Sequence, residues 1–353
     1  MARLALVMIV RDEARCIARC IESVRPHVDT MIVLDTGSVD DTIAIAERCG
    51  AEVHRFTWCD DFSVARNAAL DHSDADWNLV LDADDWLAGG FEALGPETLP
   101  PASVSPARFV GCVSIVNQGV GEGGAARRFV PRVLPRGVRY AGRVHEQPVS
   151  ALPQQPIGVE LHHDGYAEDQ LARKDGRNEA LLRAELADHP GDAYLWHQLG
   201  RELLVRGRSA EAADPLLQAC RLAAPGAVFR HSAVVSALRA LKQADRLPEA
   251  LALADEEQVR WSGSPDFYFA VADVYLECAS REPARAMDDF LPVVEGAWKR
   301  CIDIGEQPAL EGSVPGCGSW LAAGNLAMLY RTLGIDDEAD EYELLAGTMR
   351  KAA

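Results

Sequence analysis

The chain has 353 residues, of which 48% are apolar and 25% charged, a composition typical of a soluble globular protein rather than a disordered one. A chain of this length exceeds one ordinary hydrophobic core, so we expect two folding units. The net charge of −19 disfavours nucleic acid and anionic membranes as main partners. No apolar run approaches the roughly 18 residues of a membrane span, and residues 1–16 predict a first strand rather than a signal peptide.

The nine cysteines are scattered along the chain without a CxxC pair. Their odd number and their spacing favour reduced thiols in a cytoplasmic protein over a disulfide framework. Cys16 and Cys20 lie one helical turn apart, but two thiols alone do not make a metal site.

The first 90 residues alternate between apolar strands and helical segments. We expect strands at residues 4–10, 29–38, 51–58 and 77–84, and helices at 14–25, 40–50 and 62–73. This alternation with short links predicts parallel strands joined by right-handed crossovers, hence a doubly wound α/β sheet. Ligands of such sheets bind at the carboxyl ends of the strands, which here are residues 11–13, 35–38 and 82–85.

The rest of the chain has a different pattern. Residues 91–160 are rich in proline and glycine and predict short strands and long loops that form a flap over the sheet domain. From about residue 170 the pattern is helical and contains a repeat of about 34 residues. The best match comprises Trp196, Leu199, Gly200, Leu203, Ala212, Leu216 and Ala219. Two further units follow around Tyr268 and Leu326, and residues 231–257 fit more loosely.

Three aspartates follow the apolar strand in "WNLVLDADDWL", residues 77–87. Alternate residues of a strand share a face, so Asp82 and Asp84 are expected to point the same way. Carboxylate oxygens suit Mg²⁺ or Mn²⁺, which bridge to phosphate oxygens. In an acidic protein, such a metal ion is the simplest means of holding a nucleotide diphosphate.

Four segments, "LVMIVRDEA", "IVLDTGSVDDT", "FSVARNAAL" and "LVLDADDWL", resemble in order and spacing the family 2 glycosyltransferases. This resemblance implies the GT-A fold, a Rossmann-like α/β domain with one mixed sheet. Further on, "RYAGRVHEQP", "LHHDGY" and "KDGRNEALLRAEL", followed by helical repeats, resemble the sublancin-type peptide S-glycosyltransferases. The resemblance covers nearly the whole chain and implies a GT-A domain at residues 1–170 and tetratricopeptide-like repeats at 171–353.

The resemblance also implies a nucleotide pocket at the strand ends. Its expected lining residues are Val10, Arg11, Glu13, Asp35, Arg66, Asn67, Asp82 and Arg132. Two of these residues also allow simpler roles. Asp35 can organise the turn that follows it or cap the next helix, and Arg66 can pair with Asp60 or Asp61 at the surface.

The Mn²⁺ or Mg²⁺ ligands implied by the resemblance are Asp82, Asp84 and His163. Asp85 stands where the family more commonly has glutamate, which leaves its role open. The alternatives are a solvated strand end for Asp84 and a backbone carbonyl as the partner of His163.

An inverting reaction is implied, in which an acceptor hydroxyl or thiol attacks the anomeric carbon from the face opposite the nucleotide. A hydroxyl then needs a base. Glu146 is the first candidate and Asp164 the second, although either can instead support a neighbouring histidine. The metal and one of Arg127, Arg128 and Arg132 would neutralise the leaving diphosphate.

The sequence therefore predicts a metal-dependent glycosyltransferase that moves a sugar from a nucleotide sugar, a UDP-sugar, to a Cys, Ser or Thr of a polypeptide. The helical repeats would bind the peptide acceptor or form a homodimer. Two alternatives stay open: a saccharide or glycan acceptor, and a non-catalytic scaffold with a residual sheet domain. A dehalogenase-type phosphatase and a nucleotidyltransferase fit the strand order and the first loop less well.

Overall fold

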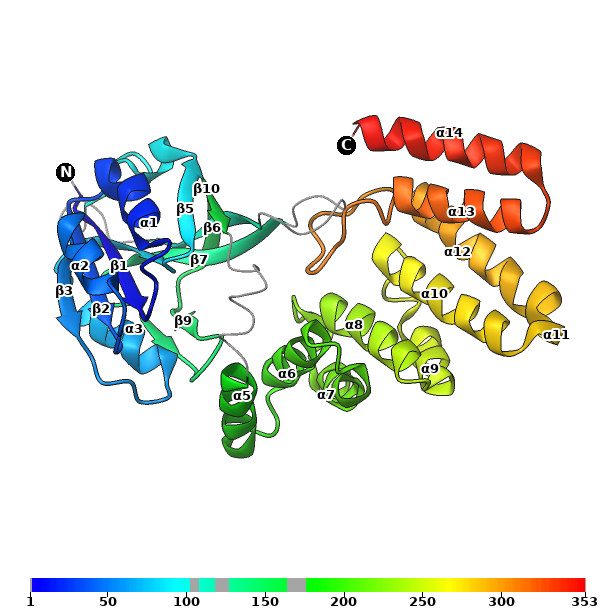
Figure 1. Ribbon diagram of the computed structural model, residues 1–353, viewed down its shortest axis with the longest axis horizontal. Coiled ribbons are helices and arrows are strands. Elements are labelled where there is room, and N and C mark those ends of the chain that lie inside the picture. Colours follow the sequence, from blue (N-terminus) through cyan, green and yellow to red (C-terminus); the bar gives the residue numbers. More distant parts are fainter. Residues whose placement is uncertain (1, 102–107, 118–126, 164–175, 353) are drawn as a thin grey trace. The chain divides into compact units, whose positions relative to one another are not determined.

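The computed structural model describes residues 2–101, 108–117, 127–163 and 176–352, shown in Figure 1. Its internal contacts separate two compact units, and among the described residues the division falls between Leu181 and Leu182. The predicted boundary at residues 170 and 171 lies outside the described residues. The first unit is built on a sheet and the second entirely on helices.

The first half of the sheet unit follows the alternation expected from the sequence. Its elements are β1 (Leu4–Val10), α1 (Ile17–Val24), η1 (Arg25–His27), β2 (Thr30–Asp35), α2 (Thr42–Arg48), β3 (Glu52–Arg55), α3 (Phe62–Asp71) and β4 (Trp77–Leu81). The apolar run of β1 is buried on both faces. Leu6 and Met8 join the core that contains Ile17 and Ile21 of α1, whereas Val7 joins the core with Leu70 of α3.

The second half of the sheet unit consists of strands with little helix. It contains β5 (Asp85–Gly89), η2 (Phe91–Leu94), β6 (Val110–Asn117), β7 (Arg127–Pro135), β8 (Arg139–Ala141), β9 (Gln147–Val149) and β10 (Gln154–His163). The main sheet has the order β3-β2-β1-β4-β7-β6-β10-β5, and β8 pairs with β9 in a separate ribbon. The parallel arrangement predicted from the alternation holds for β3, β2, β1 and β4. Because β7 is antiparallel to β4, the sheet is mixed, which confirms the predicted fold class.

The helical unit consists of helices that, from α6 onward, pack on their neighbours along the chain. The division between the units falls within α5 (Arg177–Asp188). The helices that follow are α6 (Ala193–Val205), α7 (Ser209–Leu222), α8 (Arg230–Gln243), α9 (Leu247–Glu257), α10 (Pro265–Arg281), α11 (Pro283–Arg285), η3 (Ala286–Phe290), α12 (Leu291–Ile304), α13 (Trp320–Thr332) and α14 (Asp336–Ala352). The loosely matching segment 231–257 forms the pair α8 and α9.

The small residue predicted inside the first repeat has a direct packing reason. A Cβ added to Gly200 would lie 2.4 Å from Cγ of Leu216, so the glycine allows α6 to approach α7 closely. Leu199, Ala212 and Ala219, which belong to the same pattern, are fully or almost fully buried. The repeat period read from the sequence therefore corresponds to the helix-pair spacing.

Two further expectations concern the whole chain. None of the helices in the described ranges combines the length and apolar character needed to cross a membrane. All nine cysteines lie in the described ranges, each as a free thiol, and all except Cys59 are buried.

Candidate functional site

The three aspartates after β4 form a tight turn. The amide of Asp85 donates to the carbonyl of Asp82 at 3.1 Å, and Oδ2 of Asp85 accepts from the amide of Asp82 at 3.2 Å. The turn buries Asp84 and Asp85, with 6% and 1% exposure, while the Asp82 side chain stays 34% exposed. Three carboxylates thus crowd together because the backbone reverses direction into β5.

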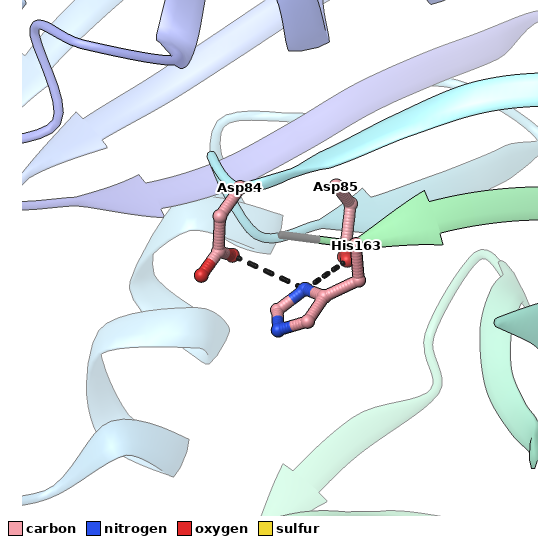
Figure 2. Close-up of side chains that lie close together, drawn as sticks. All are labelled: Asp84, Asp85 and His163. Atoms are coloured by element: carbon pink, nitrogen blue, oxygen red, sulfur yellow. Dashed lines mark hydrogen bonds and ion pairs between the residues drawn. The ribbon is translucent and has the colours of Figure 1, made fainter. Parts of the chain in front are cut away.

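His163 reaches this turn through strand pairing. It lies at the end of β10, which runs antiparallel to β5, and its register partner is Asp85. Its Nδ1 lies 2.9 Å from Oδ1 of Asp85 and 3.6 Å from Oδ1 of Asp84. Dashed lines mark both contacts in Figure 2. Burial disfavours the imidazolium, but the hydrogen bond to Asp85 and the charge of Asp84 outweigh it, and the pKa of His163 is raised.

These three side chains fit a divalent cation. Asp84, Asp85 and His163 each offer a ligand atom, and those atoms all lie within 4.8 Å of one another. Two carboxylate oxygens with one imidazole nitrogen suit Mn²⁺ or Mg²⁺ completed by further oxygen ligands. The structure thus brings the predicted Asp84 and His163 together and adds Asp85. Asp82, the third predicted ligand, faces two arginines instead.

Asp82 bridges Arg66 of α3 and Arg132 of β7. Its Oδ1 accepts from Nη2 of Arg66 at 2.7 Å, and its Oδ2 accepts from Nη2 of Arg132 at 2.5 Å. Burial alone would raise the pKa of Asp82, but the two guanidinium groups hold that pKa well below its usual range. Asp82 is therefore ionised at neutral pH.

Arg66 also connects Asp82 to Glu146. Its Nε donates to Oε1 of Glu146, whose side chain is only 9% exposed. The loop that carries Glu146 is fixed on α3, because the amide of Phe62 donates to the carbonyl of Arg143 at 2.8 Å. We call Arg66, Arg132, Asp82 and Glu146 the arginine–carboxylate cluster.

Asn67, the neighbour of Arg66, anchors the small ribbon. Its amide nitrogen donates to the carbonyl of Tyr140 at 2.9 Å, and its Oδ1 accepts from the amide of Tyr140 at 2.8 Å. This pair of bonds holds β8 on α3 and places the Tyr140 ring 5.6 Å from the Arg66 guanidinium. The predicted pocket residue Asn67 is thus engaged with backbone in this structure.

Several residues predicted to line the nucleotide pocket lie together at the ends of β1 and β2. Val10 and Asp35 are register partners, and the amide of Glu13 donates to Oγ1 of Thr42 at 2.7 Å. Asp35 is 3% exposed, and its Oδ1 accepts from the amides of Gly37 and Ser38, both at 3.0 Å. The turn-organising role that the sequence left open is therefore realised, and any nucleotide contact of Asp35 would be additional.

The remaining residues that the sequence predicted for the site lie outside the clusters described above or outside the described residues. Arg11 is exposed at the end of β1. Asp164 lies outside the described residues, as do the side chains of Arg127 and Arg128. The sequence reading missed Tyr140 and left the role of Asp85 open. Knowledge of the strand register between β5 and β10 would have identified Asp85 as the partner of His163. No local sequence pattern indicates that Tyr140 lies at the site.

Comparison with known proteins agrees with this architecture. Residues 5–93 match the model of the family described as glycosyl transferase family 2. A TPR repeat-containing protein of Synechococcus elongatus is 36% identical over 249 residues, 65% of this chain and 60% of that protein. The glycosyltransferase SunS of Bacillus phage SPbeta is 29% identical over 220 residues, 59% of this chain and 51% of SunS. The chain thus spans about half to three fifths of the length of these relatives.

Solved structures show weaker likeness. The crystal structure of MamA has a TM-score of 0.39 at 16% identity, covering 53% of this chain and 96% of MamA. Glucosyl-3-phosphoglycerate synthase from Mycobacterium tuberculosis, in complex with Mn²⁺, UDP and glucosyl-3-phosphoglycerate, has a TM-score of 0.26 at 24% identity, covering 33% of this chain and 45% of the synthase. The family match and the repeat-containing relative confirm the resemblance to a family 2 glycosyltransferase domain followed by tetratricopeptide-like repeats.

Proposed function

We propose that this protein is a divalent-metal-dependent inverting glycosyltransferase, which moves a sugar from a UDP-sugar to a Cys, Ser or Thr side chain of a polypeptide. The observation that carries the proposal is the meeting, at one edge of the sheet, of Asp84, Asp85 and His163 with the arginine–carboxylate cluster. Ligands of α/β sheets bind at this edge. The family match over residues 5–93 supports the same activity.

Asp84, Asp85 and His163 would hold the cation. When bound, a divalent cation supplies positive charge that neutralises a diphosphate as it leaves. In a chain with a net charge of −19, such compensation has to be local. The burial of Asp84 and Asp85 supports this role, because two neighbouring buried carboxylates cost free energy unless positive charge compensates them.

Arg132 is placed to contact the departing diphosphate directly. Its Nη2 lies 3.6 Å from Oδ2 of Asp85, one of the proposed cation ligands, and its side chain is 11% exposed. A guanidinium held by Asp82 before the donor arrives needs little reorganisation when negative charge develops on the leaving group.

Glu146 is our candidate for the base that accepts the proton of an acceptor hydroxyl. Arg66 fixes one carboxylate oxygen, so the other is oriented by the same ion pair. A general base has to lie within hydrogen-bond reach of the proton it removes, and a carboxylate on a loop packed against α3 meets the need for a fixed position. A thiol acceptor would depend less on Glu146, because thiols ionise more readily than hydroxyls.

The polypeptide acceptor is supported by the repeats and by the segments that resemble the sublancin-type peptide S-glycosyltransferases. Stacked helix pairs form extended surfaces of the kind that bind peptides, and this chain carries such pairs from α6 to α14. Assigning the acceptor to this chain rests on these two lines of support together.

The proposal is tested by nucleoside diphosphate release from UDP-glucose, UDP-galactose, UDP-N-acetylglucosamine and GDP-mannose, with Mn²⁺ and candidate peptides. Asp84→Ala should lower turnover by about 100-fold or more, because it removes a cation ligand. Asp74→Ala is the matched control, since Asp74 is an exposed carboxylate at the opposite end of β4. Full turnover by Asp84→Ala, or no consumption and no binding of any donor by the native protein, would contradict the proposal.

A further inference from the structure

Three buried hydrogen-bond donors around Asp82 have no partner within the part of the chain that the structure describes. They are Nη1 of Arg66, Nε of Arg132 and the hydroxyl of Tyr140. Arg66 and Tyr140 are each 6% exposed, and the Arg132 side chain is 11% exposed. Buried donors are nearly always paired, and an unpaired one costs free energy. Three of them around one ion-pair cluster therefore indicate a place prepared for oxygen acceptors.

These donors lie between two parts of the proposed machinery. Arg132 lies beside Asp85, one of the proposed cation ligands, and Arg66 holds Glu146, the proposed base. In a sugar transfer the pyranose ring lies between the diphosphate and the acceptor. The unpartnered donors are therefore placed where the transferred sugar would be, an inference that rests on the proposed function.

The charge of the cluster favours neutral oxygens over another anion. The two guanidinium groups are balanced by Asp82 and Glu146, and Asp85 adds a further negative charge near Arg132. Apart from the diphosphate, whose charge the cation would compensate, a further anion would therefore find no net positive charge. Sugar hydroxyls fit better, because each accepts from an N–H or O–H and also donates to a carboxylate.

Asp82 and Tyr140 complete the chemistry of such a subsite. The Asp82 side chain is 34% exposed, so ligands can approach its carboxylate, which has lone pairs beyond those that the arginines use. Burial raises the pKa of Tyr140, which keeps its phenol protonated at neutral pH and able to donate.

We propose that Arg66, Arg132, Asp82 and Tyr140 form the subsite that binds hydroxyl groups of the transferred sugar, and that the Tyr140 hydroxyl is a specificity-determining donor within it. A site built to hydrogen-bond a hydroxyl discriminates strongly against a ligand without it, because its buried polar groups are then left unpaired.

Tyr140→Phe tests this assignment because it removes one unpartnered atom. In the ligand-free variant the melting temperature should be unchanged or raised, since no hydrogen bond is lost. Calorimetry with Mn²⁺ should show UDP binding within about twofold of the native protein. Among UDP-glucose, UDP-galactose and UDP-N-acetylglucosamine, the donor is the one that the native protein binds more tightly than UDP. The ratio of its affinity to that of UDP should fall by about 3- to 10-fold in the variant.

Tyr330→Phe is the matched control. Tyr330 is also 6% exposed, but its hydroxyl donates to Oε1 of Glu295 at 2.6 Å. This control should lower the melting temperature and leave both UDP and UDP-sugar binding unchanged.

The outcomes separate the inference from the proposed function. If the native protein binds neither UDP nor any UDP-sugar with Mn²⁺, the proposed function fails. If it binds UDP and a UDP-sugar, but Tyr140→Phe keeps the full advantage of the sugar or melts at a lower temperature than the native protein, the sugar subsite fails while the proposed function stands.

Discussion

Each unit of this protein buries an arginine against carboxylates, and the two arginines differ in what surrounds them. Arg66 in the sheet unit is 6% exposed and Arg230 in the helical unit is 7% exposed. Nη1 of Arg230 donates to the carbonyls of Cys220 and Ala223 at 2.8 and 2.7 Å, at the end of α7. Its Nη2 pairs with Glu257 of α9, whose other oxygen accepts from the indole of Trp261 at 3.0 Å.

Arg66 donates to no backbone carbonyl within the part of the chain that the structure describes. It joins Asp82 and Glu146, which come from two separate strand-end loops, and Asp82 is open to solvent. A buried charge therefore does not by itself indicate a functional site. Arg230 also has one buried donor, Nε, without a partner in the described structure. The surroundings decide: carbonyls at a helix end make Arg230 a structural residue, whereas two neighbouring unpaired donors and the partly exposed Asp82 make Arg66 a candidate for binding.

The largest expected effects come from replacing these two arginines. Arg230→Met should lower the free energy of unfolding by about 3 kcal/mol, because the buried Glu257 would lose its buried partner and keep only the ion pair with the exposed Arg260. Turnover per folded molecule should not change. Arg66→Met should also destabilise the protein, but it should in addition lower turnover by about 100-fold in the fraction that is folded. Urea unfolding and steady-state kinetics measure both. Normal turnover in folded Arg66→Met would remove the distinction.

Two acids with shifted pKa values should change stability with pH in opposite directions. The pKa of Asp82 is lowered by its arginines, so its contribution to stability is complete above the unfolded pKa of about 3.9 and is lost as pH falls through the folded pKa. Asp82→Asn should therefore have a shallower loss of stability below about pH 4 than the native protein. Urea midpoints measured from neutral to acidic pH would show it, and parallel curves would contradict the ion-pair assignment.

Asp266 of α10 provides the opposite case. It is 2% exposed, and burial raises its pKa although the amide of Val314 donates to its Oδ1 at 2.6 Å. A raised pKa means that stability is lost as pH rises through the folded pKa. Asp266→Asn keeps an oxygen acceptor for Val314, so at neutral pH it should equal or exceed the native protein in thermal stability. If Asp266→Asn were clearly less stable than the native protein at pH 7 but equally stable in acid, the pKa of Asp266 would be lowered rather than raised.

The smallest expected effect concerns an ion pair at the surface of the helical unit. Nζ of Lys242 on α8 lies 3.0 Å from Oδ2 of Asp273 on α10, and both side chains are partly exposed. Lys242→Met should change the free energy of unfolding by roughly 0.5 kcal/mol, because solvent screens such pairs. Chemical denaturation with and without added salt measures it. A loss comparable to that of Arg230→Met would show that exposure does not separate the two kinds of ion pair.

Much of the fold could be predicted because its signals are local. The apolar run Leu4–Val10 and the helical spacing around Ile17 and Ile21 each specify an element from neighbouring residues alone. Gly200 and Leu216, likewise, fall at the packing positions of a repeat whose period is visible in the sequence. The strands after β4 were harder to predict, because their pairing joins residues far apart in the chain and their order is not consecutive.

The candidate site shows the same division. Asp82, Asp84 and Asp85 are adjacent in the sequence, so their crowding at a strand end could be read directly. Their separate roles could not, because these depend on which distant side chain each one meets. His163, 78 residues from Asp85, meets it through the register of β10 with β5, and Arg66 meets Glu146 across 80 residues.

The sequence by itself determined the alternation of strands and helices, the acidic edge of the sheet and the repeat period, since each arises from the spacing of polar and apolar side chains within a few turns or strands. The tertiary structure alone decided that Asp82 faces arginines while Asp84 and Asp85 face His163. It also decided that the Tyr140 hydroxyl is buried without a partner in the described structure. The physical reason is that hydrogen bonds and ion pairs act over a few ångströms, and only the folded chain brings these groups within that distance.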